Sequence, residues 1–284
     1  MTINIRIIEF GMFRLDGGAM FGSVPKNLWA KLIPVDEENC IPLASRSMLI
    51  EVPGKKILVD VGLGDKWDEK STKIFGIKNT PRSLLGFQDS EITDVILTHL
   101  HFDHGGGISC WGATPGTVER QYPHARIHLQ RSNYERAKNP GLRERASYLK
   151  ENVSVIDASK DTLLDADGTI LTGAGWSISG FHIDGHTLGQ QWIEVQLDAP
   201  LYGASTFMFA TDLIPTSRHL PLPYHMGYDL CAEKVMDEKK VFLERAIAKN
   251  AVVVFQHDPD TPAGRVGINE KGHYALKETF SFPS

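Results

Sequence analysis

The chain has 284 residues, of which 42% are hydrophobic and 23% are charged, and its formal net charge is −5 at pH 7. A chain of this length can bury about three quarters of its unfolded surface, which is enough for one large core. The negative net charge argues against a protein built mainly to bind nucleic acid or an anionic membrane. No apolar run approaches the roughly 18 to 20 residues that cross a bilayer.

The N-terminus and the cysteines lead us to expect a cytoplasmic protein. The first ten residues alternate polar and apolar side chains, whereas a secretory signal needs an uninterrupted apolar stretch. Cys40, Cys110 and Cys231 are odd in number and include no Cys-x-x-Cys pair, so we expect reduced thiols.

Short apolar or alternating runs in the first half predict strands at residues 3–10, 47–52, 56–60, 93–98 and 125–129. We expect helices from about Ser132 and between Arg143 and Lys150. The chain contains no internal repeat, low-complexity tract or linker, which favours one domain over residues 1–284.

The second half repeats this arrangement, with strands predicted at residues 176–181, 191–197, 207–210 and 251–255. Apolar residues spaced along one face predict a helix between Glu233 and Lys249. Strands with interspersed helices in both halves indicate an α/β (α+β) fold of two packed sheets with helices outside.

Two segments are predicted to be loops. Residues 11–46 contain Gly17-Gly18 and Pro25, and we expect this segment to expose Met20, Phe21 and Trp29. Residues 215–228 are rich in proline and aromatic side chains. Long ordered loops often form lids or binding walls, although a surface excursion or a dimer arm is an equal alternative for the first.

The strongest chemical signal is the run His99-Leu100-His101-Phe102-Asp103-His104, followed by three glycines. It begins where the apolar strand at 93–98 ends, and imidazole and carboxylate are the ligands that zinc and similar divalent ions prefer. In an extended segment His99 and His101 point to the same side. A turn at Phe102 then directs Asp103 and His104 towards a second position. The alternative is a polar surface loop that happens to be rich in histidine.

Three later residues supply what a two-metal site would still lack. His186 lies in a glycine-flanked turn between two predicted strands, and Asp212 and His257 each follow an apolar strand. Each of them alone is more often a structural or surface residue. Because all of these residues sit at strand ends or in the turns that follow, we expect them to converge at one edge of the sheets.

The pattern His99-x-His101-x-Asp103-His104 resembles the signature of the metallo-β-lactamase superfamily. Further superfamily motifs follow in order: Leu58-Val59-Asp60-Val61-Gly62, Gly185-His186-Thr187-x-Gly189, Thr211-Asp212 and His257. The resemblance implies an αββα sandwich in which His99, His101 and His186 hold one metal ion. Asp103, His104 and His257 would hold the other, Asp212 would bridge the two, and Asp60 would orient a ligand.

Within the superfamily, the chain most resembles the quorum-quenching N-acyl homoserine lactonases. The resemblance is carried by residues 15–22 with Pro25-Lys26, by the histidine run, and by Asp212-Leu213-Ile214-Pro215-Thr216. Some lactonases have a substrate-holding tyrosine where this chain has Pro215, so the phenol would come from Tyr224 or Tyr228, or be absent. The superfamily also often has a histidine at the position of Gln190.

Seven side chains are candidates for an apolar substrate pocket, although Phe87 and the leucines are equally candidates for ordinary core: Met20, Phe21, Phe87, Leu220, Leu222, Tyr224 and Tyr228.

The resemblance implies a hydrolase in which two divalent ions share a bridging hydroxide that attacks the lactone carbonyl. Asp103 and Asp212 would serve catalysis as well as metal binding. Zinc fits these ligands best, with manganese, iron and cobalt as alternatives. The expected partner is a small ester or lactone, and a homodimer is suggested by analogy.

Two other functions remain open. The same metal pair can attack phosphorus, so an aryl-ester or phosphotriester hydrolase of the methyl-parathion-hydrolase type is the enzymatic alternative. A metal-bound binding protein without turnover is the non-enzymatic one.

Overall fold

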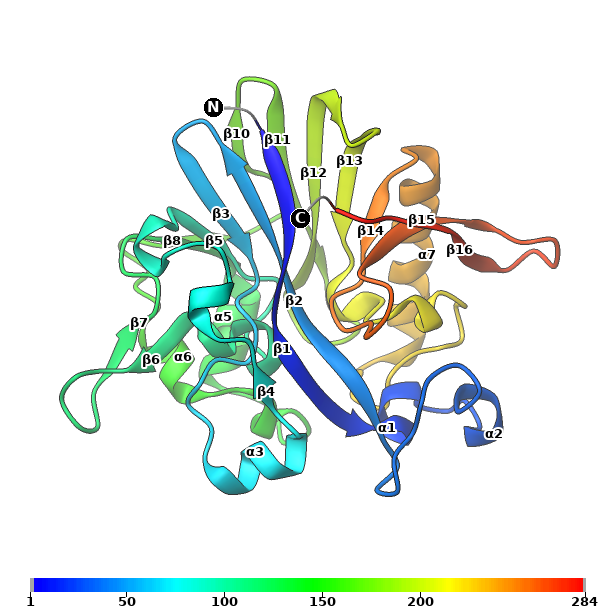
Figure 1. The fold of residues 1–284 in the computed structure, drawn as a ribbon, viewed down its shortest axis with the longest axis horizontal. Helices are drawn as coiled ribbons and strands as arrows, with labels where there is room; N and C mark the ends of the chain where they lie inside the picture. The colour runs from blue at the N-terminus through cyan, green and yellow to red at the C-terminus, as the bar shows by residue number, and fades with distance from the viewer. Residues whose placement is uncertain (1–2, 283–284) are drawn as a thin grey trace.

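Two seven-stranded sheets form the centre of the computed structural model, which describes residues 3–282 (Figure 1). The first sheet has the order β4-β1-β2-β3-β5-β8-β9. Its strands are β1 (Asn4–Asp16), β2 (Cys40–Val52), β3 (Lys55–Val59), β4 (Lys78–Asn79), β5 (Asp94–Ile96), β8 (Arg126–Gln130) and β9 (Thr162–Leu164). Strands β3, β5, β8 and β9 run parallel, so their carboxyl ends meet at one edge.

The second sheet follows chain order from β10 to β16. Its strands are β10 (Gly168–Gly173), β11 (Trp176–Ile183), β12 (Gln190–Leu201), β13 (Ala204–Phe209), β14 (Val252–Val254), β15 (Ala263–Ile268) and β16 (Tyr274–Thr279). All neighbours are antiparallel except β13 and β14. A separate hairpin joins β6 (Ser109–Trp111) to β7 (Val118–Arg120).

Three apolar clusters hold the layers together. One lies between the sheets and includes Ile50, Val195 and Phe207. A second packs the outer face of the first sheet against α5 (Arg131–Lys138) and α6 (Lys150–Ser154). The third packs the second sheet against α7 (Ala232–Ala248). The order helix, sheet, sheet, helix confirms the αββα sandwich expected from the sequence.

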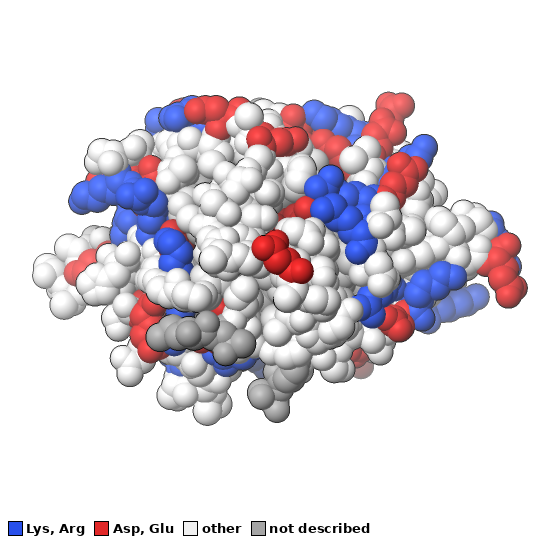
Figure 2. Space-filling view, turned by 90° about the horizontal axis from the view of Figure 1, so that it is seen from above, with Lys and Arg blue, Asp and Glu red and all other residues white. Residues whose placement is uncertain are grey.

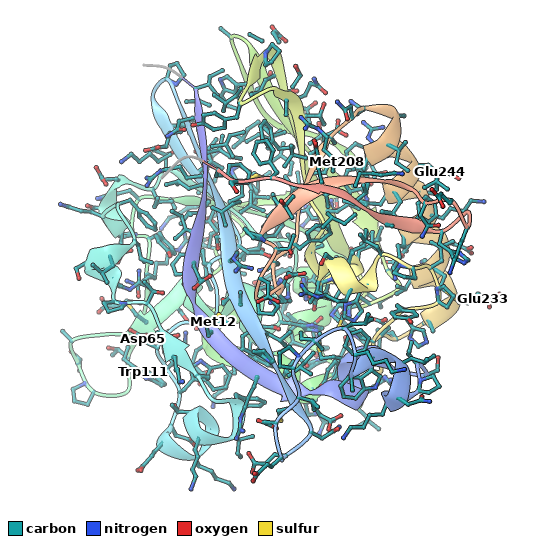
Figure 3. All side chains as sticks on the ribbon, turned by 45° about the vertical axis from the view of Figure 1, so that its right-hand side comes forward. Met12, Asp65, Trp111, Met208, Glu233 and Glu244 are labelled. Carbon is teal, nitrogen blue, oxygen red and sulfur yellow. The ribbon has the colours of Figure 1, made fainter. Side chains whose placement is uncertain are left out.

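Helix α7 shows why an amphipathic pattern places a helix on a sheet. Met208 of β13 is fully buried beneath α7 beside Phe242, while Glu233 and Glu244 lie on the helix face away from the sheet (Figure 3). Burying the apolar face stabilises this layer, because each fully buried large side chain contributes about 1.5–3 kcal/mol.

Most predicted strands are present within a few residues of their predicted bounds. The helix predicted between Arg143 and Lys150 is wrong: residues 145–147 form a single 3-10 turn, and α6 begins only at Lys150. Seven strands were not predicted from the sequence: β4, β6, β7, β9, β10, β15 and β16. The single-domain organisation stays a prediction, and residues 1–2 and 283–284 of its range lie outside the described residues.

The long loop predicted for residues 11–46 is also wrong. Residues 11–16 and 40–46 belong to β1 and β2, which pair from Asn4 with Glu51 to Asp16 with Cys40. A register shift between Glu9 and Gly11 lets this long pair bend. Only residues 17–39 leave the sheet, and they contain α1 (Gly17–Phe21) and α2 (Lys26–Trp29).

Met20, Phe21 and Trp29 are buried, contrary to the sequence prediction, with exposed fractions of 1%, 0% and 1%. The Phe21 ring stacks between Trp29 and His219, with centroid distances of 5.4 and 4.5 Å. These side chains form a fourth apolar cluster with the ends of β1 and β2. The N-terminal excursion is therefore a packed part of the fold.

The end of the molecule shown in Figure 2 carries basic and acidic side chains side by side. Among the described residues, no helix is both long enough and apolar enough to cross a membrane.

Candidate metal centre

The candidate site residues lie where strands end, as expected from the sequence. His99 and His101 follow β5, and His101 precedes α4 (Phe102–Gly105), the single helical turn that contains Asp103 and His104. His186 lies in the turn between β11 and β12.

The two remaining residues follow neighbouring parallel strands. Asp212 comes after β13 and His257 after β14. Because parallel strands end at the same edge of a sheet, these side chains meet although 45 positions separate them in the chain.

The structure gathers all seven predicted side chains into two buried clusters that share Asp212. In each cluster, one nitrogen or oxygen atom per residue lies within 4.8 Å of every other. The clusters are His99, His101, His186 and Asp212, and Asp103, His104, His257 and Asp212. The Oδ2 atom of Asp212 lies 3.2 Å from Nε2 of both His186 and His104, and its Oδ1 lies 3.2 Å from Nε2 of His257.

The ring nitrogens that face away from the clusters have their own partners. Nδ1 of His104 lies 3.0 Å from Oδ2 of Asp60, and Nδ1 of His186 lies 2.8 Å from Oδ1 of Asp229. Nδ1 of His257 lies 2.8 Å from the carbonyl oxygen of Ala44. Such contacts fix the tautomer and the orientation of each ring, and leave Nε2 free to face the cluster.

Asp60 contacts Thr98 as well as His104, and so joins the end of β5 to the turn that contains His104. It accepts hydrogen bonds from the backbone N–H and the hydroxyl of Thr98, both at 2.8 Å. Its backbone has a φ of 60°, in the left-handed region that is uncommon for residues other than glycine. With these contacts Asp60 is placed to orient the His104 ring, and the role that the resemblance implies stays a prediction.

The His101 ring faces the cluster with Nδ1, whereas the other rings described above face it with Nε2. Its Nδ1 lies 3.1 Å from Nε2 of His186, while its Nε2 points outwards and lies 3.7 Å from Oε2 of Glu144. Burial opposes ionisation of Glu144, but the nearby His101 ring and the hydrogen bonds from Thr187 and Arg136 outweigh it and lower the pKa of Glu144 to about 2.

Sequence reasoning missed both Asp229 and Glu144. Asp229 lies one residue beyond the predicted loop 215–228, and Glu144 lies inside the segment that was wrongly predicted to be a helix. No motif marks either position, because their contacts to His186 and His101 arise only in the folded chain.

The glycines after His104 allow two loops to approach each other. A Cβ atom on Gly106 would lie 2.2 Å from the carbonyl oxygen of Leu63, and one on Gly107 would lie 2.2 Å from that of Val61. Any larger residue would push the loop after β3 away from the turn that carries Asp103 and His104. The three glycines after the histidine run therefore permit this close backbone approach.

The charges of the site suit a divalent cation. Burial opposes ionisation of Asp212, but His104 and His186 outweigh it and hold the pKa of Asp212 well below its usual range. Burial lowers the pKa of His99 well below its ordinary value. Burial would lower the pKa of His104 too, but Asp212 and Asp103 raise it well above the usual value. A bound cation competes with that proton.

The donor atoms also fit such a cation. The facing nitrogens of His257 and His104 are 3.2 Å apart, and Nε2 of His99 and Oδ1 of Asp212 are buried and have no hydrogen-bond partner among residues 3–282. Nitrogen and carboxylate lone pairs directed at one another at these distances are the arrangement that zinc-type ions require. The two clusters thus indicate a dinuclear metal site.

The clusters lie at a cavity of about 430 Å³. Its walls are largely apolar and include Leu15, Met20, Phe75, Phe102 and Met226. Rings pack behind this wall, since Trp67 lies in edge contact with Phe75 and Phe102 at centroid distances of 5.7 and 5.3 Å. An apolar wall beside a polar floor is the usual form of a small-molecule site.

Of the seven side chains predicted for the substrate pocket, the structure brings Met20 and Tyr228 to this cavity. Leu220, Leu222 and Tyr224 instead line a separate cavity of about 1010 Å³.

Of the other two predicted pocket residues, Phe21 lies in the core and Phe87 is partly buried against it. Phe21 is buried behind the wall by the stacking described above, and Phe87 packs edge-on against Phe10 at 6.5 Å. These five side chains lie away from the cavity at the clusters, because hydrophobicity alone does not distinguish a cavity wall from the core. Which residues contact a substrate stays a prediction.

Comparisons with known proteins agree with this geometry. The family model described as the metallo-beta-lactamase superfamily matches residues 40–257. An N-acyl homoserine lactonase of Bacillus sp is 25% identical over 184 residues, which are 63% of this chain and 61% of that protein. The match therefore spans less than two thirds of this curated relative.

Two solved structures extend the likeness over nearly the whole chain. A probable metal-dependent hydrolase from Staphylococcus aureus has a TM-score of 0.82 at 26% identity, covering 98% of both chains. AidC, a dizinc quorum-quenching lactonase solved with the product N-hexanoyl-L-homoserine, has a TM-score of 0.75 at 18% identity, covering 100% of this chain and 97% of its own. The second likeness shows the fold alone. The chain belongs to the metallo-beta-lactamase superfamily.

Proposed function

We propose that this chain is a dinuclear-metal hydrolase that opens the lactone ring of N-acyl homoserine lactones. The observation that carries the proposal is the pair of buried clusters sharing Asp212 at the floor of an apolar-walled cavity. The lactonase relatives support the choice of substrate.

In this proposal His99, His101 and His186 would hold one ion, Asp103, His104 and His257 would hold the other, and Asp212, which belongs to both clusters, would serve both. Zinc suits four nitrogen and oxygen ligands of this kind. A bound pair of such ions polarises a carbonyl oxygen and lowers the pKa of water towards neutrality.

The chain's own residues hold the substrate. The apolar wall that includes Leu15, Met20 and Met226 accepts the acyl chain, because burying each methylene group contributes about 0.8 kcal/mol. Burial raises the pKa of the Tyr228 phenol to about 12, so this group stays protonated and can donate a hydrogen bond to a substrate oxygen. Tyr228 thereby supplies the phenol that Pro215 cannot, whereas Tyr224 lies at the other cavity.

The test compares His104→Ala with His124→Ala, since His124 is an exposed histidine that does not belong to either cluster. Metal content and ring opening, monitored through proton release from a panel of acyl lactones, are measured for both variants and the wild type. We expect His124→Ala to retain both properties and His104→Ala to lose one ion and at least a hundredfold in turnover.

Other outcomes identify the alternatives. Faster turnover of an aryl phosphotriester than of any lactone would replace the proposal with the phosphotriester hydrolase. Two bound ions without turnover of either substrate would indicate a binding protein.

A further inference from the structure

Arg143 is the only cationic side chain among those that line the catalytic cavity in the described part of the chain. The other charged groups along its lining, apart from histidine, are the carboxylates of Asp103, Glu144 and Asp212. A single guanidinium in such surroundings would ordinarily pair with one of them.

Arg143 nevertheless forms no ion pair with any carboxylate of residues 3–282. Both oxygens of the adjacent Glu144 are already engaged: Oε1 accepts from Arg136, and Oε2 accepts from the hydroxyl of Thr187 at 2.7 Å. The charge of Arg143 therefore remains available at the cavity.

The guanidinium is held in place by Gly227, another residue of the cavity lining. Its Nη2 donates a hydrogen bond to the carbonyl oxygen of Gly227. The N–H of Gly227 donates to the carbonyl oxygen of Ala19 at 2.7 Å, and the N–H of Met226 donates to Oδ2 of Asp229 at 2.7 Å. Arg143 thus spans from the segment after α5 to a loop that is fixed on two sides, and its other N–H groups have no acceptor among the described residues.

Tyr228 follows Gly227 directly and lines the same cavity. Its hydroxyl makes no hydrogen bond with any of residues 3–282. The guanidinium of Arg143 and the phenol of Tyr228 therefore both line the cavity beside Gly227, and both have N–H or O–H donors without an acceptor among the described residues.

We infer that Arg143 and Tyr228 form a subsite for a carboxylate carried by the acyl part of the substrate, away from the bond that is cleaved. This inference rests on the proposed hydrolase function. The planar guanidinium presents paired N–H groups that match the two oxygens of a carboxylate, and only one of its donors is used by Gly227. The preferred substrates are therefore acyl esters or lactones with an anionic acyl chain.

The test uses two substrates of equal acyl length, p-nitrophenyl hexanoate and the mono-p-nitrophenyl ester of adipic acid, with the full-length zinc-loaded protein. The second ester has a terminal carboxylate that the first lacks. We expect kcat/KM to be about tenfold higher for the carboxylated ester, as one exposed charge-assisted contact provides. The difference should lie in KM.

The variants locate the effect. Arg143→Gln abolishes the preference and Arg143→Lys retains part of it. Arg145→Gln is the matched control, because Arg145 is a neighbouring exposed arginine that does not line the cavity, and it keeps the full preference. Unchanged zinc content and melting temperature exclude a folding defect in each variant.

Equal kcat/KM values for the two esters in the wild type, or an undiminished preference in Arg143→Gln, would overturn the subsite. If neither ester is cleaved, the proposed function fails, but binding of monomethyl adipate by calorimetry still decides the subsite. Binding that is about tenfold weaker in Arg143→Gln than in the wild type supports it, and equal binding overturns it.

Discussion

Replacing Asp229 by asparagine should weaken metal binding although Asp229 lies outside both clusters. Its carboxylate is buried and has two donors facing it, Nδ1–H of His186 at 2.8 Å and the N–H of Met226 at 2.7 Å. An asparagine of the same size has only one oxygen, so its NH₂ group must face one of these donors.

The size of the effect follows from the contact that is lost. A hydrogen bond to a charged group contributes about 1.5–3 kcal/mol. Since about 1.4 kcal/mol corresponds to a factor of ten, zinc affinity at the His186 cluster should fall about 10- to 100-fold. The second cluster has no contact with Asp229 and should keep its affinity.

Competition with a chromophoric chelator measures the two affinities separately. Asp237→Asn is the matched control, because Asp237 is exposed on α7 and the substitution removes the same charge far from any cluster residue. Equal zinc affinities for Asp229→Asn and the wild type would refute the argument that Asp229 sets the orientation and basicity of His186. Equal losses in both variants would show that net charge alone matters.

Three further predictions concern stability. Reloading the metal-free protein with zinc at a hundredfold excess over its Kd should raise the free energy of unfolding by about 2.7 kcal/mol in urea titrations, and no change would contradict a native metal site. Phe21→Ala should lower the free energy of unfolding by about 3–5 kcal/mol in the same titrations. Leu32→Ala should lower it far less, because Leu32 is 41% exposed. Equal losses in the two variants would contradict the packed N-terminal cluster. Burial lowers the pKa of Lys239 to about 7, so between pH 7 and the ordinary value of 10.5 the unfolded state binds more protons than the folded one. Stability should therefore rise with pH across that window in the wild type and not in Lys239→Met, as urea midpoints at pH 7 and 9 will show.

The metal centre could be predicted from the sequence because its ligands are marked by local patterns. His99 and His101 follow an apolar run, Asp212 and His257 follow two more, and glycines flank His186. Each pattern specifies a strand end, and the fold brings these ends together. The spacing of a motif thus carries three-dimensional information wherever the backbone around it is regular.

The substrate wall and the N-terminal segment could not be predicted in the same way. Residues 17–33 have no period of two or of 3.6, since the segment consists of two short helices joined by turns. The burial of Phe21 depends on Trp29 and His219, and His219 lies almost 200 residues away. Such pairings have no local signature, so an apolar residue in this segment could equally be wall, core or surface.

The short loop 226–229 shows why the metal centre and the N-terminal segment should be coupled. Asp229 orients His186, Gly227 bonds to Ala19 in α1 on one side and to Arg143 on the other, and Tyr228 lines the cavity between them. A substitution in α1 that moves this loop must also move the partner of a cluster histidine. Changes at Ala19 and at Asp229 should therefore be non-additive in zinc affinity, as residues that share one hydrogen-bonded segment are. The N-terminal excursion, which has no cluster residue of its own, thereby contributes to the geometry of the metal centre.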